Sequence, residues 1–130
     1  MTTIRLLLNS DFTGANAFFA LAEARGMFRD LGLDIGFTPG RGAYTAAERL
    51  ATEPFDAAYG DLNALIALAA GSADVLPVGV FMVHEHAPST ITVSAGGPIR
   101  GPGDLAGRKL IGHRTDVALR KFPAIALSTG

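Results

Sequence analysis

The sequence predicts an α/β fold in which a mainly parallel sheet is flanked by helices. Short apolar and β-branched runs alternate with segments of helical periodicity, in the order strand, helix, strand, helix, strand, helix. This order is typical of parallel strands joined by right-handed crossovers. The chain has 130 residues, of which 48% are hydrophobic, so it is long enough for one compact domain with a core and too short for two full domains.

The first strand and helix set the plan that the chain then repeats. Residues 3–8 form an apolar run that predicts a buried strand, and the polar residues 9–14 form a loop that opens a helix. In residues 17–31 apolar side chains recur every three or four positions, which predicts a helix with one face on the sheet. Gly26 weakens this helix in its middle, and Gly32 suits its C-terminal cap. The predicted sheet-facing residues are Ala17, Leu21, Ala24, Phe28 and Leu31.

The next two strands and the helix between them follow the same order. Alternation of apolar and polar residues in 33–37 predicts a second strand, and residues 55–59 predict a short third strand. Between them, residues 38–42 form a turn, and a helix follows that Pro54 stops. The apolar face of that helix is predicted to be Ala43, Ala46, Ala47 and Leu50.

A third helix, Leu62–Ala70, is apolar on all sides and is expected to be covered on most of them. Asp61 is a suitable N-cap for this helix, and Gly71 ends it. The same segment is the longest apolar run of the chain, and it is far shorter than the roughly 20 residues that span a bilayer. We therefore expect a soluble chain with no direct membrane insertion.

The second half of the chain is predicted to add strands and one long helix. A turn-forming linker, residues 96–103, leads into a short helical turn at 104–107. Residues 116–127 predict a last helix that Pro123 kinks or breaks. The predicted strands, which are rich in β-branched residues, span 75–83, 89–94 and 108–112.

Charge and cysteine content exclude several classes of function. The chain has 11 Lys and Arg against 12 Asp and Glu, so there is no basic excess to bind a nucleic acid backbone. Cys is absent, which excludes disulfides, thiolate metal sites and Cys nucleophiles. The first residues lack the charged segment, apolar run and cleavage site of a secretory signal, so either a signal was removed or the chain is not exported.

Side chains that can bind a ligand follow the predicted strand ends, where open α/β sheets hold their ligands. After the first strand, Asp11, Phe12 and Thr13 can clamp a ligand by hydrogen bonding and ring stacking. The alternative is that the Asp is a helix cap and the Phe a lid on the core. Tyr59 and Asp61 flank Gly60 after the third strand, and this loop is a second candidate for ligand binding. The alternative is that Tyr59 is a core ring and Asp61 a helix cap.

Two further loops suit an anion. Gly40, Arg41 and Gly42 combine backbone N–H groups with a guanidinium at a helix start, which fits a carboxylate, sulfonate or phosphate; the alternative is a solvated turn. The last predicted strand-to-helix turn holds His113, Arg114 and Thr115. The dipole of the helix that follows favours an anion beside them.

No cofactor or metal is predicted. His84 and His86 would share one strand face and could ligate a metal, but no third ligand is placed beside them. The glycine fingerprint of dinucleotide-binding folds is missing, since Gly40 and Gly42 are followed by Thr45, and there is no Walker motif.

Several strings of the sequence resemble one protein family. Residues 11–13 (DFT), 21–28 (LAEARGMF) and 32–35 (GLDI) resemble the opening of NMT1/THI5-like solute-binding proteins. Residues 55–61 (FDAAYGD) resemble the family's third strand and ligand loop, and residues 103–112 (GDLAGRKLIG) resemble its DLxGKxIG crossover. The resemblance covers essentially the whole chain. Relatives in this family bind sulfonates, taurine, nitrate and thiamine-pyrimidine precursors for ABC importers.

The resemblance implies a type II periplasmic-binding-protein fold, in which two α/β lobes close on a ligand. It implies that residues 1–130 hold a single α/β lobe, the N-terminal one, with the crossover and first helix of a second lobe from about residue 94, and that the chain is truncated. The implied function is the substrate-binding component of a bacterial ABC importer, with a small anionic or heteroaromatic solute as ligand and a permease as partner. The implied location is the periplasm or cell surface, and the missing signal keeps a cytoplasmic location open. A face left bare by the missing lobe would favour self-association.

The residues favour a binding protein over an enzyme. Part of the resembling family, the fungal pyrimidine synthases, uses its own His together with a Cys-rich iron segment in a self-consuming reaction. Phe18 stands where that His is expected, and there is no Cys. Ser10 and Ser89 lack a nucleophile-elbow pattern. We expect no turnover; a cytosolic thiamine-pyrimidine biosynthesis-like module and a non-binding fragment remain as alternatives.

Overall fold

The structure is a computed structural model that describes residues 1–71, 74–86, 89–112 and 116–129. The chain divides into two compact units, Met1–Val78 and Gly79–Gly130. The first unit carries the sheet, and the described residues of the second form extended segments, one 3-10 helix and one α-helix.

A parallel sheet organises the first unit. The strands are β1 (Thr2–Leu7), β2 (Leu33–Thr38) and β3 (Ala57–Ala58), and their order in the sheet is β2-β1-β3. Leu6 of the central strand lies opposite Phe37 in β2 and Ala57 in β3, with both pairings parallel. The prediction of an α/β fold with a parallel sheet flanked by helices is confirmed.

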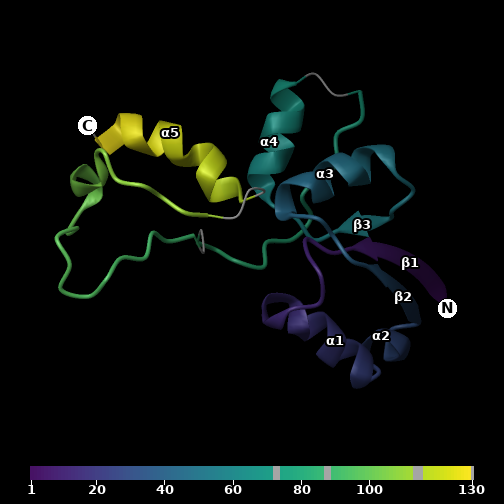
Figure 1. Ribbon diagram of the computed structural model, residues 1–130. Helices are drawn as coiled ribbons and strands as arrows, with labels where there is room; N and C mark the ends of the chain where they lie inside the picture. Colours follow the sequence, from purple (N-terminus) through teal and green to yellow (C-terminus); the bar gives the residue numbers. More distant parts are fainter. Residues whose placement is uncertain (72–73, 87–88, 113–115, 130) are drawn as a thin grey trace. The chain divides into compact units, whose positions relative to one another are not determined.

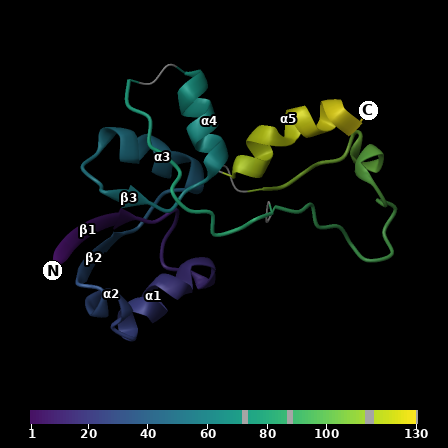
Figure 2. The same cartoon turned by 180° about the vertical axis from the view of Figure 1, so that it is seen from behind.

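Helices cover both faces of this sheet (Figures 1 and 2). After a 3-10 helix, η1 (Gly14–Asn16), the helices α1 (Ala17–Ala24) and α2 (Met27–Asp30) lie on one face. On the other face lies α3 (Ala43–Thr52), with α4 (Leu62–Ala70) packed against it. The first unit is therefore a three-layer arrangement of helices, sheet and helices.

The prediction of one continuous helix over 17–31 is wrong. Gly26 adopts a left-handed φ of 71°, and its N–H donates to the Glu23 carbonyl at 2.9 Å, so the chain turns there and restarts as α2. The predicted sheet-facing side is wrong in part, since Leu21 is 51% and Leu31 75% exposed. Phe28 contacts Phe37 of β2 as predicted. Phe19, which was not in the predicted set, also contacts Phe37. Because α1 is apolar almost throughout, periodicity alone could not choose between its sides.

Most other predictions for the first unit agree with the structure, but α4 is less covered than expected, since Leu62 is 49% and Ile66 61% exposed. The core residues Leu7 and Leu8, of the first strand and its end, are fully buried. The small side chains where α3 and α4 pack, Ala46, Ala47 and Ala64, are buried as well. Asp61 caps α4, because its Oδ1 accepts the Asn63 N–H at 2.7 Å. Gly71 ends this helix, as expected.

The second unit holds η2 (Pro102–Leu105), which packs against α5 (Val117–Thr129). In the described parts of residues 75–83, 89–94 and 108–112 no strand forms, so these three predictions are wrong. Val80 is 92% exposed, which shows that β-branched residues do not make a strand without a partner to complete the backbone ladder.

Two further helical features concern the second unit and the membrane. Residues 102–105 form the short helical turn two residues earlier than expected, with Pro102 at its start, where a missing N–H is tolerated. Pro123 lies inside α5 and does not break it. Among the helices of the described residues, none is both long and apolar enough to cross a membrane.

Candidate functional site

The carboxyl ends of the three parallel strands lie at one edge of the sheet. We call the segments that follow them, residues 9–13, 39–42 and 59–61, the carboxyl-edge loops. The first two are joined directly, since the Gly42 N–H donates to the Asn9 carbonyl at 2.7 Å and the Gly40 N–H to the Ser10 carbonyl at 3.1 Å. This edge, beside the central strand of a β2-β1-β3 sheet, is where open α/β sheets bind ligands.

Gly40 is required for this contact between the loops. A Cβ at this position would lie 1.8 Å from the Leu8 carbonyl oxygen, far inside van der Waals contact. Only a residue without a side chain fits there, so the sequence Gly-Arg-Gly places its first glycine against the end of β1.

The third loop is fixed between the central strand and α3. The Tyr59 N–H donates to the Leu7 carbonyl at 2.8 Å, which continues the β1–β3 pairing by one residue. A Cβ at Gly60 would lie 3.3 Å from the Ala43 carbonyl oxygen at the start of α3. The backbone at Gly60 therefore lies close against the start of this chain's own helix α3.

A buried asparagine, which the sequence analysis missed, holds the first loop. Asn16 is fully buried; its Oδ1 accepts the Thr13 N–H at 2.8 Å and its Nδ2 donates to the Asp11 carbonyl at 3.1 Å. These bonds fix the backbone on both sides of Phe12 while the Asp11 and Phe12 side chains stay exposed. An Asn immediately before a predicted helix is the signal that pointed to such a role.

Aromatic rings surround the carboxyl edge on the α1 side of the sheet. Phe12 meets Phe37 edge-on with ring centroids 5.6 Å apart, and Tyr59 lies edge-on to Phe18 at 5.9 Å and to Phe19 at 5.6 Å. Phe12 is 49% and Phe18 41% exposed, so both present ring surface to solvent. Such surfaces can stack on a planar ligand. Phe18 and Phe19 were not among the predicted site residues, because a Phe in an apolar helix carries no signal of a site.

The expected anion cradle is only partly present. The N–H groups of Gly40 and Gly42 are engaged by the Ser10 and Asn9 carbonyls, so they are not offered to an anion, which corrects that expectation. Arg41 remains exposed beside them. Its charge helps to lower the pKa of Glu53, although the hydrogen bond from Arg49 is the larger cause.

The remaining predicted site residues divide between the two halves of the chain. Asp61 shares its Oδ1 between the Asn63 backbone and side-chain amides, at 2.7 and 2.6 Å, so its cap role is established. His113, Arg114 and Thr115 lie outside the described residues. His84 and His86 do not share a strand face, because no strand forms there in the described residues. Within the described ranges, no group of three or more potential ligands could hold a metal ion.

Chemically, the carboxyl edge offers ring faces, an exposed carboxylate and an exposed guanidinium on a rigid backbone. The lowered carboxyl pKa values of the first unit belong to two ion pairs, Arg5 with Asp56 and Arg49 with Glu53. The arrangement is suited to holding a small molecule.

Comparison with known proteins gives one match. No curated protein and no solved structure matches the chain. A family model described as "NMT1/THI5 like" matches residues 14–127, which is most of the chain and includes α1, two of the carboxyl-edge loops and most of α5. The three-stranded parallel sheet flanked by helices agrees with a lobe of the type II periplasmic-binding-protein fold expected from the sequence. With the order of its elements and the match to the family model in agreement, this chain belongs to the NMT1/THI5-like family.

Proposed function

We propose that this chain is a substrate-binding component of an ABC importer and that its carboxyl-edge loops bind a small organic solute. Family membership supports a substrate-binding or related role. The observation that carries the proposal is the rigid edge itself, where two loops joined through Gly40 and Gly42 hold exposed side chains beside the central strand. On this proposal the chain works with a permease, at the periplasmic side or the cell surface.

The ligand we favour has a heteroaromatic ring, as in a thiamine pyrimidine precursor. Phe12 and Phe18 expose ring surface, and the Tyr59 ring lies edge-on to Phe18 of α1. The glycine N–H groups that would bind sulfonate or nitrate are already bonded within the chain. Stacking is therefore better supported than anion capture, and Arg41 would pair only with a charged substituent.

Isothermal titration calorimetry of the full chain tests this choice. Titration with 4-amino-5-hydroxymethyl-2-methylpyrimidine is expected to give saturable binding, whereas taurine and nitrate give none at the same concentrations. Phe12→Ala should weaken binding about fivefold, since stacking contributes about 1 kcal/mol. Leu31→Ala, which removes a 75%-exposed side chain just before the start of β2, is the matched control and should bind like wild type.

We also propose that the chain catalyses no turnover of this ligand. The family holds mostly binding proteins together with biosynthetic members, so the point needs its own measurement. Chromatography of the pyrimidine after prolonged incubation with the chain should return it unchanged. A product that disappears in the Asp11→Asn variant would contradict the proposal and favour an enzyme.

A further inference from the structure

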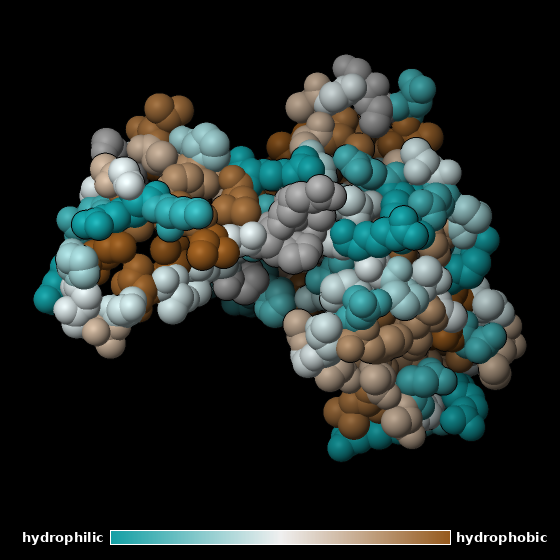
Figure 3. Space-filling model, viewed as in Figure 1, coloured by the Kyte–Doolittle hydropathy of each residue, from teal (hydrophilic) through white to brown (hydrophobic). Residues whose placement is uncertain are grey.

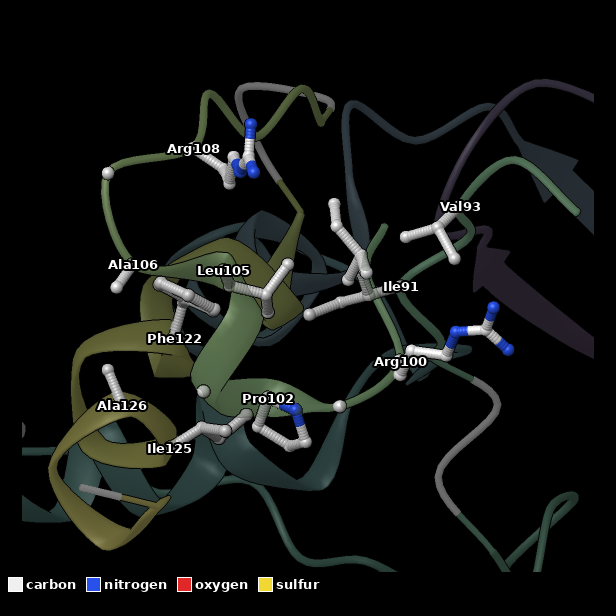
Figure 4. A pocket seen from close by; sticks show the side chains of 14 residues that line it. Ile91, Val93, Arg100, Pro102, Leu105, Ala106, Arg108, Phe122, Ile125 and Ala126 are labelled. Carbon is white, nitrogen blue, oxygen red and sulfur yellow. The ribbon is translucent and has the colours of Figure 1, made fainter. Parts of the chain in front are cut away.

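A pocket lies entirely within the second unit. It has a volume of about 660 Å³, is open to solvent on one side and is lined by α5, η2 and the extended segment before them (Figure 4). Ligand pockets in proteins measure about 300–1,000 Å³, so this pocket is large enough for a small molecule. In Figure 3, hydrophobic side chains gather around a hollow in this part of the chain. The principal apolar side chains that line it are Ile91, Val93, Ile99, Leu105, Phe122 and Ile125.

The charged residues of the lining are both cationic. Arg100 and Arg108 line the pocket, no Asp or Glu does, and the two guanidinium groups lie on separate sides in Figure 4. The Arg100 end has a carboxylate beside it, since Asp104 Oδ2 accepts the Arg100 N–H at 2.8 Å. Arg108 is instead followed by Lys109. The Arg108 end is therefore the more positive of the two.

We propose that this pocket binds an amphiphilic anion, with its apolar body between α5 and η2 and its carboxylate at Arg108. Apolar walls make burial of an alkyl or aryl body favourable, and a guanidinium at the rim pairs with a carboxylate through two parallel hydrogen bonds. This inference goes beyond the proposed function, because the pocket lies within Gly79–Gly130 and the carboxyl-edge loops within Met1–Val78.

The glycine in η2 makes the pocket easy to block. A Cβ at Gly103 would meet no atom within 4 Å. Gly103→Val therefore fills part of the pocket with a side chain, and its Cβ does not clash with the rest of the chain. From the opposite wall, Ala126→Phe places a ring in the same space. Ala124 is exposed on the same helix and does not line the pocket, so Ala124→Phe is the matched control.

Calorimetric titration of the full chain with decanoate, below its aggregation concentration, tests the pocket. Decanoate is expected to bind, and both Gly103→Val and Ala126→Phe should weaken binding about tenfold or more, because each displaces the buried body of the ligand. Ala124→Phe should bind like wild type. Circular dichroism of each variant confirms that the helices are retained.

Charge variants test the orientation. Arg108→Gln should weaken decanoate binding about fivefold, as expected for a partly exposed ion pair, whereas Arg100→Gln changes it less than about twofold. Decanol should bind more weakly than decanoate, and decyltrimethylammonium more weakly still.

Several results would overturn the proposal. These are the absence of decanoate binding, full binding by both blocking variants, an Arg108→Gln variant that binds like wild type, and loss of decanoate binding in Phe12→Ala, which would assign decanoate to the first unit. The chain should not co-sediment with phosphatidylglycerol vesicles, and co-sedimentation would assign the positive end to a membrane surface instead.

Discussion

Gly40 makes the closest backbone approach at the carboxyl edge, so its substitution should be the most damaging single change there. In Gly40→Ala the new Cβ would lie 1.8 Å from the Leu8 carbonyl oxygen and 2.7 Å from the Asn9 carbonyl carbon. These are backbone atoms, so the end of β1 has to shift. We expect the free energy of unfolding to fall by about 3 kcal/mol, as for a strongly overpacked site.

Urea unfolding followed by tyrosine fluorescence measures this loss. The chain's 2 Tyr residues, Tyr44 and Tyr59, both belong to the first unit, so the signal reports that unit alone. Gly14→Ala is the control: a Cβ at Gly14 meets no atom within 4 Å, and its unfolding free energy should change by less than about 0.5 kcal/mol. Equal effects of the two substitutions would show that the loops do not meet through Gly40.

Asn16 is the second residue on which the first loop depends. Asn16→Ala leaves the Thr13 N–H and the Asp11 carbonyl without their side-chain partner, at a cost of about 1–3 kcal/mol in unfolding free energy. The same urea experiment measures it, and the pyrimidine affinity should fall as well because Phe12 loses its fixed position. Thr52→Ala, which removes one exposed hydrogen bond within α3, is the control and should leave the affinity unchanged.

At the scale of elements, one carboxylate extends the pairing of β1 with β3. Asp56 Oδ2 accepts both the Arg5 N–H at 2.8 Å and Nε–H at 2.9 Å, and Oδ1 accepts Nη2–H at 2.9 Å. The side-chain hydrogen bond from Arg5, followed by the backbone one, lowers the pKa of Asp56 from 3.8 to about 2. The carboxylate therefore extends a pairing in which β3 itself contributes only Ala57–Ala58.

The lowered pKa sets the pH range in which this contact is lost. A carboxyl whose pKa is lower in the folded chain stabilises it above the unfolded value and ceases to do so as pH falls through the folded value. The contribution is therefore complete above about pH 4 and disappears toward pH 2. Urea titrations should show Asp56→Asn less stable than wild type at pH 6, with the difference shrinking toward pH 2. A difference that stays constant over this range would contradict the assignment, and high salt should reduce it because the pair is exposed.

The elements of the first unit were largely predictable, because their signals are local. The alternation in residues 33–37, the helical spacing around Ala46 and Ala47 and the Asp61 cap all lie within short windows and appear as expected. The strand predictions at 75–83 and 108–112 failed because a strand also needs a partner, which no local window contains. The prediction of which side of α1 faces the sheet failed because this helix is apolar on several sides.

The candidate site could be predicted in position and less well in chemistry. The loops after the strands follow from parallel topology, so Asp11, Gly40, Tyr59 and Gly112 were expected at strand ends along one edge. Asp11, Gly40 and Tyr59 follow strands of one sheet, whereas Gly112 follows no strand in the described residues. The N–H groups of Gly40 and Gly42 donate to carbonyls of the neighbouring loop, about 30 residues away in sequence. Periodicity within a short window cannot predict such a contact.

At the scale of the whole molecule, the exposed apolar segment of residues 78–81 favours association between copies of the chain. Val78 is 80%, Val80 92% and Phe81 83% exposed, and such exposure is unusual for a monomer. Sedimentation velocity over increasing concentration should show growing association, and Val80→Lys with Phe81→Glu should reduce it. Leu31→Lys, at another exposed apolar position, is the control and should sediment like wild type. A single monomeric species at high concentration would contradict this prediction.

The most direct test of the central claim is an NMR titration of the isotope-labelled full chain with 4-amino-5-hydroxymethyl-2-methylpyrimidine. The backbone amides of residues 11–13, 41–42 and 59–61 should shift together and saturate with one dissociation constant, since they lie on the carboxyl-edge loops. The amides around Leu31, before the start of β2, should stay unchanged. Saturating shifts confined to residues outside the carboxyl-edge loops, or no shifts at all, would contradict the account.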